Sequence, residues 1–126
     1  MKKIFVFVVD SYANPRLTEG LNALGLKPDE EYYVTGAGGS RIILSDDCGK
    51  RFVESERLLV FLSSFRGEVE PAVKLAKEIK SINPNAKIVF RSSTERSSDP
   101  VFFTNMKKDP NYEVTLKIVE EFISEK

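Results

Sequence analysis

The sequence has no histidine and a single cysteine, Cys48, among its 126 residues. The absence of histidine excludes a histidine-based catalytic triad, a zinc ion held by histidine and an imidazole pH switch. One cysteine excludes an internal disulfide and any Cys-x-x-Cys redox or zinc pair. Without a histidine as base, a catalytic thiol at Cys48 is not expected.

An excess of basic charge is also lacking, because 19 lysines and arginines balance 19 aspartates and glutamates. Domains that bind nucleic acid usually carry a clear basic excess or a basic face. Lys74, Lys77 and Lys80 share one side of a predicted helix, which is typical of a solvated outer face. No nucleic-acid partner is expected.

Long apolar runs are missing as well. The run at 4–9 is six residues long and ends at Asp10, too short for a membrane span or the core of a signal peptide. Together with the free thiol, this predicts a cytoplasmic protein without a membrane partner. With 41% hydrophobic and 30% charged residues, the chain is expected to fold as a single domain over residues 1–126.

Apolar runs alternate with amphipathic stretches along the chain, the pattern of βα units around a mainly parallel sheet. We therefore predict an α/β fold, a three-layer sandwich with about five strands. The predicted strands are 3–9, 31–35, 58–62, 86–90 and 101–104. One predicted helix starts near residue 15, and three others cover 48–56, 69–82 and 111–124. Residues 41–44 fit either a strand or the start of a helix.

Ligands of open α/β sheets bind beyond the carboxyl ends of the strands, and small hydroxyl side chains gather at those ends here. The candidate residues for binding a small anion are Asp10, Ser11, Ser63, Ser64, Arg66, Ser92 and Ser93. An arginine at a helix entrance beside hydroxyl groups would suit an anion. Alternatively, these serines serve only as helix caps and turn residues.

The only glycine-rich segment, 36–40, has neither the Gly-Lys-Ser/Thr ending of a Walker loop nor the spacing of a dinucleotide-binding fingerprint. It is either a flexible turn or a backbone nest for phosphate. Asp10, Asp46 and Asp47 show no spacing that would bring them together around a metal, and capping of a helix explains Asp46. We expect no metal site and no cofactor.

Adjacent aromatic residues near the predicted last strand point to a contact surface. On a strand, Phe102 and Phe103 would face opposite sides. One of them would then lie at an edge of the sheet and support a homodimer or another protein partner.

Three segments, RLLVFLSS, VEPAVKLAKEIKSINPNAKIVFRSS and DPVFFTNMKKDPNYEVTLKIVEEFI, resemble the receiver domains of two-component response regulators. The resemblance implies a flavodoxin-like fold with strand order 2-1-3-4-5 and a role in signalling or regulation. It also implies that the last strand and the last helix form the usual dimer face.

The residues that receivers use for phosphorylation mostly do not match. Asp10 is followed by Ser11 rather than by a second acid, and Leu62 and Ser63 stand where the phosphoacceptor aspartate is expected. Ser92 matches the hydroxyl residue that ends strand four, but Asn105 stands near the position of the lysine. Only about ten residues separate strands four and five, whereas a parallel crossover usually needs about a dozen or more. Either the fourth helix is reduced to a turn near 93–96, or strand five does not pair as in a receiver.

These departures predict a non-catalytic receiver-like module that acts through protein–protein interaction. The alternative is a small-anion or nucleotide binding protein, with or without an enzymatic activity, that uses the strand-end residues. The balance of the sequence favours a protein that is not an enzyme.

Overall fold

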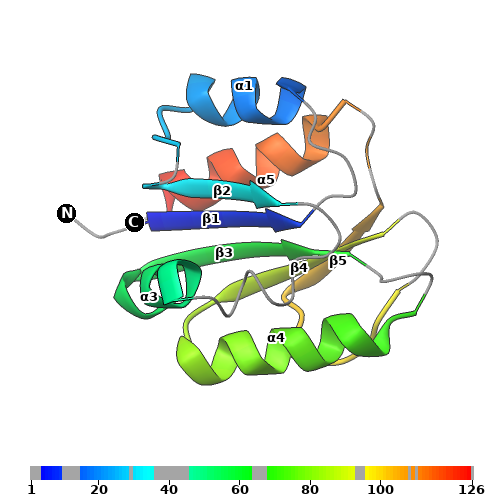
Figure 1. The fold of residues 1–126 in the computed structure, drawn as a ribbon. Helices are drawn as coiled ribbons and strands as arrows, with labels where there is room; N and C mark the ends of the chain where they lie inside the picture. The colour runs from blue at the N-terminus through cyan, green and yellow to red at the C-terminus, as the bar shows by residue number, and fades with distance from the viewer. Residues whose placement is uncertain are drawn as a thin grey trace.

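The sheet consists of β1 (Ile4–Val9), β2 (Tyr32–Thr35), β3 (Arg57–Leu62), β4 (Lys87–Ser92) and β5 (Thr104–Lys107). In this computed structural model the strands pair in the order β2-β1-β3-β4-β5, and every neighbouring pair is parallel (Figure 1). The structure describes residues 4–9, 15–28, 30–35, 46–63, 68–92, 96–107, 109 and 111–125. The order is the predicted flavodoxin-like one.

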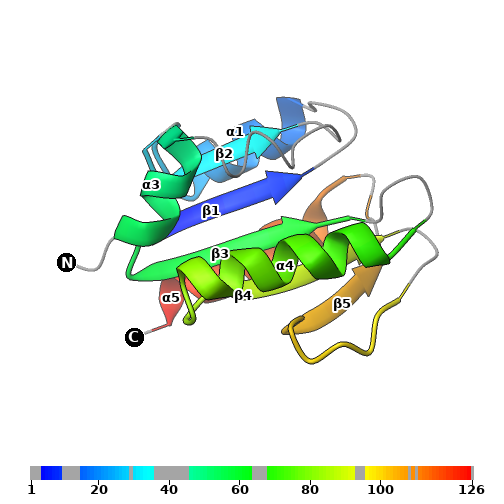
Figure 2. The same cartoon turned by 60° about the horizontal axis from the view of Figure 1, so that its bottom comes forward.

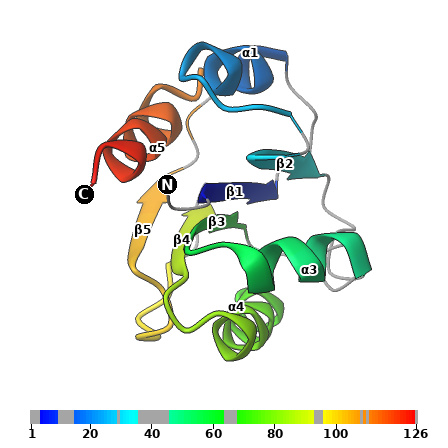
Figure 3. The same cartoon turned by 90° about the vertical axis from the view of Figure 1, so that its left-hand side faces the viewer.

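Helices cover both faces of the sheet. They are α1 (Pro15–Ala23), α3 (Asp46–Glu54), α4 (Glu70–Ile82) and α5 (Glu113–Ser124). α1 and α5 lie side by side on one face, and α3 and α4 lie on the other (Figures 2 and 3). The predicted three-layer α/β sandwich is confirmed.

The sequence of β1 explains why this strand lies inside the sheet. Phe5 and Phe7 pack on the side of α3 and α4, whereas Val6 and Val8 pack on the side of α1 and α5. All four side chains are fully buried. Complete burial of each such side chain stabilises the fold by about 1.5–3 kcal/mol, which favours a central position covered by helices on both faces.

The boundaries of α4 follow from its terminal residues. Pro71 lies in the first turn, where its missing N–H costs no hydrogen bond, and Glu70 suits the positive end of the helix dipole. The helix ends at Asn83, whose backbone is extended and which precedes Pro84. The Asn83 side-chain amide donates to the backbone oxygens of Phe52 at 3.0 Å and Ser55 at 2.8 Å. The end of α4 is thereby joined to the connection between α3 and β3.

Several predicted boundaries are wrong. β4 continues two residues past Phe90 to Ser92, and α3 covers 46–54 rather than 48–56, so that Asp46 is its first helical residue. The strand predicted at 101–104 is instead β5, Thr104–Lys107, which pairs in parallel with β4. Residues 96–103, the part of this connection that the structure describes, contain no helix. The described part of the crossover is therefore irregular, and β5 nevertheless pairs in parallel with β4.

The outer face of α4 is exposed at Lys74 and Lys77, as predicted, whereas Lys80 is half-buried and donates to the backbone oxygen of Pro84 at 3.3 Å. The segments 36–40 and 41–44 and the side chain of Cys48 lie outside what the structure describes. Of the helices in the described ranges, none combines the length and the apolar character that a membrane span requires.

Candidate functional site

Two of the predicted site residues lie at the carboxyl edge of the sheet, where ligands bind in this class of fold. Ser63 directly follows β3, and Ser92 is the last residue of β4. These strands are neighbours, with Leu62 opposite Phe90, so the two serines lie at adjacent strand ends. Ser92 is only 2% exposed, and Ser63 is partly buried. A ligand arriving from solvent would therefore meet little of the Ser92 hydroxyl.

The other candidate residues, Asp10, Ser11, Ser64, Arg66 and Ser93, lie outside the described residues. The anion pocket stays a prediction for that reason. Among the residues that are described, no three acidic or cysteine side chains are grouped in a way that could hold a metal ion.

A buried arginine that the sequence analysis did not single out lies directly beside Ser92. Arg91 is 1% exposed and projects from β4 toward α5. Its Nε donates to the hydroxyl of Thr115 at 3.0 Å and lies 3.3 Å from Oδ1 of Asp109. Its Nη2 donates to the backbone oxygen of Asp109 at 3.2 Å and lies 3.3 Å from Oδ1. A charged network therefore joins the guanidinium on β4 to Thr115 of α5 and to Asp109, which precedes α5.

Asp109 joins this network to the start of α5. Its Oδ2 accepts hydrogen bonds from the backbone N–H groups of Val114 at 2.8 Å and Thr115 at 3.1 Å, and Oδ1 accepts from the Thr115 hydroxyl at 2.7 Å. Burial alone would raise the pKa of Asp109, but the hydrogen bonds from Thr115 and the charge of Arg91 hold it below the ordinary value. The carboxylate thus acts both as the counter-ion of Arg91 and as the cap of the helix.

The residue that precedes α5 has an unusual backbone. Tyr112 adopts the left-handed conformation, with φ of 59°, and its side chain makes no capping hydrogen bond. Its ring is buried, and the guanidinium carbon of Arg91 lies 5.0 Å from the ring centroid. The cation–π contact and burial offset the cost of a left-handed tyrosine, which is of the order of 1 kcal/mol or more.

One sequence signal could have indicated the Arg91 network. A buried arginine in an otherwise apolar strand requires a carboxylate partner, so extending the predicted strand past Phe90 would have raised the question of which acid pairs with Arg91. In the structure Arg91 lies opposite Met106 of β5, and Asp109 follows two residues after the end of β5. That register could not be read from the sequence.

Asn105, which stands near the position where receivers carry a lysine, has a local structural role. Its side-chain Oδ1 accepts from the backbone N–H of Ser97 at 2.9 Å, and its Nδ2 donates to the Ser97 oxygen at 2.8 Å. Both ends of the amide are thus used to hold the connection between β4 and β5 against the edge strand.

Phe102 and Phe103 have opposite environments although neither belongs to β5. Phe102 is buried and stacks on Phe90 with 5.1 Å between ring centroids. Phe103 is 62% exposed, and its backbone N–H donates to the oxygen of Ile88 at 2.7 Å. The Nζ of Lys87 lies 5.0 Å from the centroid of the Phe103 ring. Phe103 therefore presents an aromatic surface beside the edge strand.

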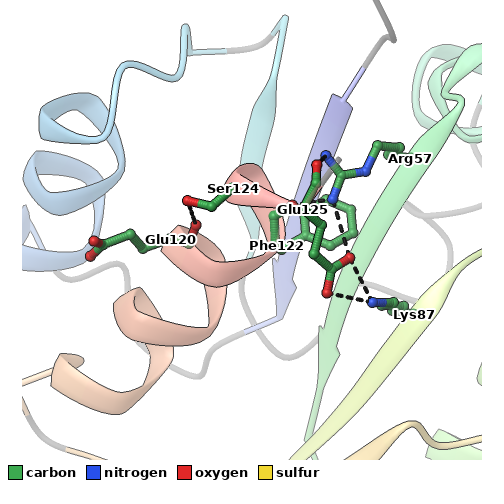
Figure 4. A network of polar contacts seen from close by, with 6 residues as sticks. All are labelled: Arg57, Lys87, Glu120, Phe122, Ser124 and Glu125. Atoms are coloured by element: carbon green, nitrogen blue, oxygen red, sulfur yellow. Dashed lines mark hydrogen bonds and ion pairs between the residues drawn. The ribbon is translucent and has the colours of Figure 1, made fainter.

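A second charged network lies at the opposite end of the sheet, shown in Figure 4. Nζ of Lys87 lies 2.7 Å from both carboxylate oxygens of Glu125. Arg57 donates to the backbone oxygens of Phe122 and Glu125, and its guanidinium carbon lies 4.5 Å from the centroid of the Phe122 ring. The hydrogen bond from Lys87, and the charges of Lys87 and Arg57, lower the pKa of Glu125 against the opposing effect of desolvation. This network fixes the end of α5 to β3 and β4.

Comparisons of the chain with models of protein families and with curated proteins gave no match.

Proposed function

We propose that this chain is a receiver-like module that does not undergo aspartyl phosphorylation and acts in the cytoplasm through protein–protein contact, in signalling or regulation. The observation that carries the proposal is Phe103. This large aromatic side chain is 62% exposed beside the edge strand and offers apolar surface that a partner protein could cover.

Two further observations support a role without phosphorylation. β3 ends at Leu62, which is 1% exposed and packs in the core, and the next residue is Ser63. In the receivers that the chain resembles, this strand end carries the phosphoacceptor aspartate. Asn105, near the expected lysine position, uses its amide to bind Ser97. Neither position supplies the charge that phosphoryl transfer to an aspartate would require.

Photo-crosslinking tests the contact at Phe103. The residue is replaced by p-benzoylphenylalanine in the full chain, and irradiated cells that naturally contain the protein are examined for adducts. Val53 on α3 is the matched control, because it is 67% exposed and also apolar. We expect a discrete protein adduct from position 103 and none from position 53. Equal labelling at both positions, or none at 103, would refute a specific contact there.

Incubation with Mg²⁺ and acetyl phosphate tests the second half of the proposal. Intact-protein mass spectrometry should show no added phosphoryl group. A mass increase of one phosphoryl group that is located on an aspartate and removed by hydroxylamine would contradict the proposal.

The alternative, binding of a small anion, is favoured by the adjacent strand-end positions of Ser63 and Ser92. A thermal-shift titration with phosphate, sulfate and nucleotides distinguishes the two functions. Saturable stabilisation by one of these anions, lost in Ser63→Ala, would support the alternative, whereas an unchanged melting temperature supports the contact module.

A further inference from the structure

A groove of about 590 Å³ runs between α1 and α5 on the outer surface of the molecule. Its apolar part is formed by Gly20 and Ala23 from α1, by Leu24 directly after α1, and by Leu116 from α5. Both helices lie on the same face of the sheet, side by side (Figure 3). This groove is distinct from the carboxyl edge of the sheet and from Phe103.

Small residues on α1 create this groove. A Cβ atom on Gly20 would lie 2.4 Å from Cδ1 of Leu116, so the two helices approach closely only because position 20 has no side chain. Ala23, one turn further along, adds a single methyl group to the surface. The short side chains leave a depression above the line where the helices touch, and half-buried Leu24 and Leu116 line it.

The rim of the groove is predominantly acidic. Glu113, Glu120 and Glu121 line it, with Lys117 as the single basic residue. Positions 113, 117, 120 and 121 form one stripe along α5, because residues three and four apart are neighbours on a helix surface. All four side chains are exposed, and in the described part of the chain none of them takes part in an ion pair.

The length of the groove along α5 suits about two turns of a docked helix. The stripe from Glu113 to Glu121 covers eight residues of rise, about 12 Å, which corresponds to about two turns of a docked helix. A third helix lying against two side-by-side helices places apolar residues at i, i+3, i+4 and i+7 into the space between them. Basic residues on either side of that apolar stripe would then lie opposite the three glutamates.

We infer that the groove between α1 and α5 docks a basic amphipathic helix of a partner protein, with apolar side chains against Leu24 and Leu116 and lysines or arginines against the acidic rim. This inference rests on the proposed role in protein contact and names a surface and a partner chemistry for it. Phe103 belongs to a different surface, so the two contacts can be tested separately.

The probe is a fluorescein-labelled 18-residue peptide of leucine and lysine, with leucine at every i, i+3, i+4 and i+7 position. Fluorescence anisotropy measures its binding to the full chain, and backbone amide shifts in NMR spectra locate it. We expect saturable binding with shifts concentrated in α1 and α5. A scrambled peptide of the same composition, which has no apolar face, should bind at least about tenfold more weakly, because it cannot place its leucines in the groove.

Charge reversal tests the rim. Glu120→Lys/Glu121→Lys should weaken binding about tenfold, because two attractive pairs become repulsive. Lysines near the end of α5 also suit its dipole, so this variant should fold. The matched control is Glu56→Lys/Glu78→Lys, which makes the same change of net charge away from the groove and should leave the dissociation constant within about twofold.

Three results would overturn the inference: amide shifts that map to other elements, equal binding of the scrambled peptide, or equal weakening by both pairs of charge reversals. If these occur while position 103 still crosslinks to a partner, the groove assignment fails and the proposed function stands. If position 103 gives no adduct but the groove binds the probe as expected, the fault lies in the Phe103 contact.

Discussion

Removal of the Asp109 carboxylate should cost more stability than any substitution of an exposed charge in this chain. Arg91 is 1% exposed, and Asp109 is its carboxylate partner, with Oδ1 at 3.3 Å from both Nε and Nη2. The same carboxylate accepts two backbone N–H groups at the start of α5. Asp109→Ala removes the counter-ion and the cap together, whereas Asp109→Asn retains an oxygen that can accept the backbone hydrogen bonds.

The magnitude follows from these contacts. Breaking a buried ion pair by removing one partner costs about 3–5 kcal/mol, because the remaining charge is left buried without compensation. Loss of a capping acceptor costs about 1 kcal/mol. We therefore expect Asp109→Ala to lower the free energy of unfolding by about 4 kcal/mol, and Asp109→Asn by about 3 kcal/mol. Since domains of this size have about 5–15 kcal/mol of stability, both variants should still fold at 25 °C.

Urea denaturation followed by circular dichroism measures these changes. The control is Lys77→Gln, which removes an ion pair of 3.6 Å between Asp99 and an exposed lysine and should cost less than about 1 kcal/mol. If Asp109→Asn also costs less than about 1 kcal/mol at an unchanged m-value, the reasoning about Arg91 is wrong.

The dependence of stability on pH provides a second measurement of the same carboxylate. Its pKa in the folded chain lies below the ordinary value of 3.8. A group whose pKa is lowered by folding stabilises the protein above its unfolded pKa, and this contribution is lost as the pH falls through the folded pKa. The difference in unfolding free energy between the native chain and Asp109→Asn should therefore be constant from pH 5 to 7 and shrink below about pH 4. A difference that is unchanged down to pH 2 would contradict this assignment.

Three other substitutions test packing and hydrogen bonds. Gly20→Ala should destabilise the native chain by about 1 kcal/mol, because the added methyl group clashes with Leu116. In a Leu116→Ala chain the same substitution should stabilise the fold by about 1 kcal/mol, because alanine favours a helix more than glycine does. If urea denaturation gives the same sign in both chains, the two helices do not approach as closely as inferred. Asn83→Ala should cost about 2–3 kcal/mol by the same assay, because two buried carbonyls lose their donor. Asn105→Ala should accelerate hydrogen exchange at the Ser97 amide about tenfold, and unchanged exchange would show that the amide pair is unimportant.

The apolar pattern of the sequence was sufficient to predict the layers, because burial determines which strands need helices on both faces. β1 has apolar residues at consecutive positions, so helices must cover both of its faces, and the structure has Phe7 and Val8 fully buried on opposite sides. The order 2-1-3-4-5, in contrast, came from the resemblance to receivers rather than from the apolar pattern.

The error at β5 shows where an apolar pattern is insufficient. Val101 and Phe102 are β-branched and aromatic, but their backbone N–H groups bind Asp99, through its side chain at 3.0 Å and its backbone oxygen at 3.2 Å. Those donors form a local turn instead of pairing with β4. The sequence predicted that Phe102 and Phe103 face opposite sides, but it could not indicate which of them is buried or which oxygen each N–H binds.

The Arg91 network could not be predicted for a related reason. Its two charged members are 18 positions apart, and only the strand register and the start of α5 bring them together. Most of the predicted anion site lies outside the described residues, so the structure leaves that prediction untested. Ser92, the one buried member that is described, is next to an arginine already engaged with Asp109 and Thr115.

Charged contacts hold α5 at both of its ends, and this bears on the groove. Asp109 joins its start to Arg91, and Glu125 joins its end to Lys87 and Arg57 (Figure 4). α1 packs on the sheet through Leu17 and Leu21, and Tyr32 of β2 donates a 2.7 Å hydrogen bond to Asn22 of α1. Arg16, in the first turn of α1, also donates to the side chain of Asn111, which precedes α5. Because polar contacts hold both helices, the docked helix should bind without separating them. Amide shifts caused by the leucine–lysine peptide should accordingly be largest where the two helices line the groove, at 20–24 and 113–121.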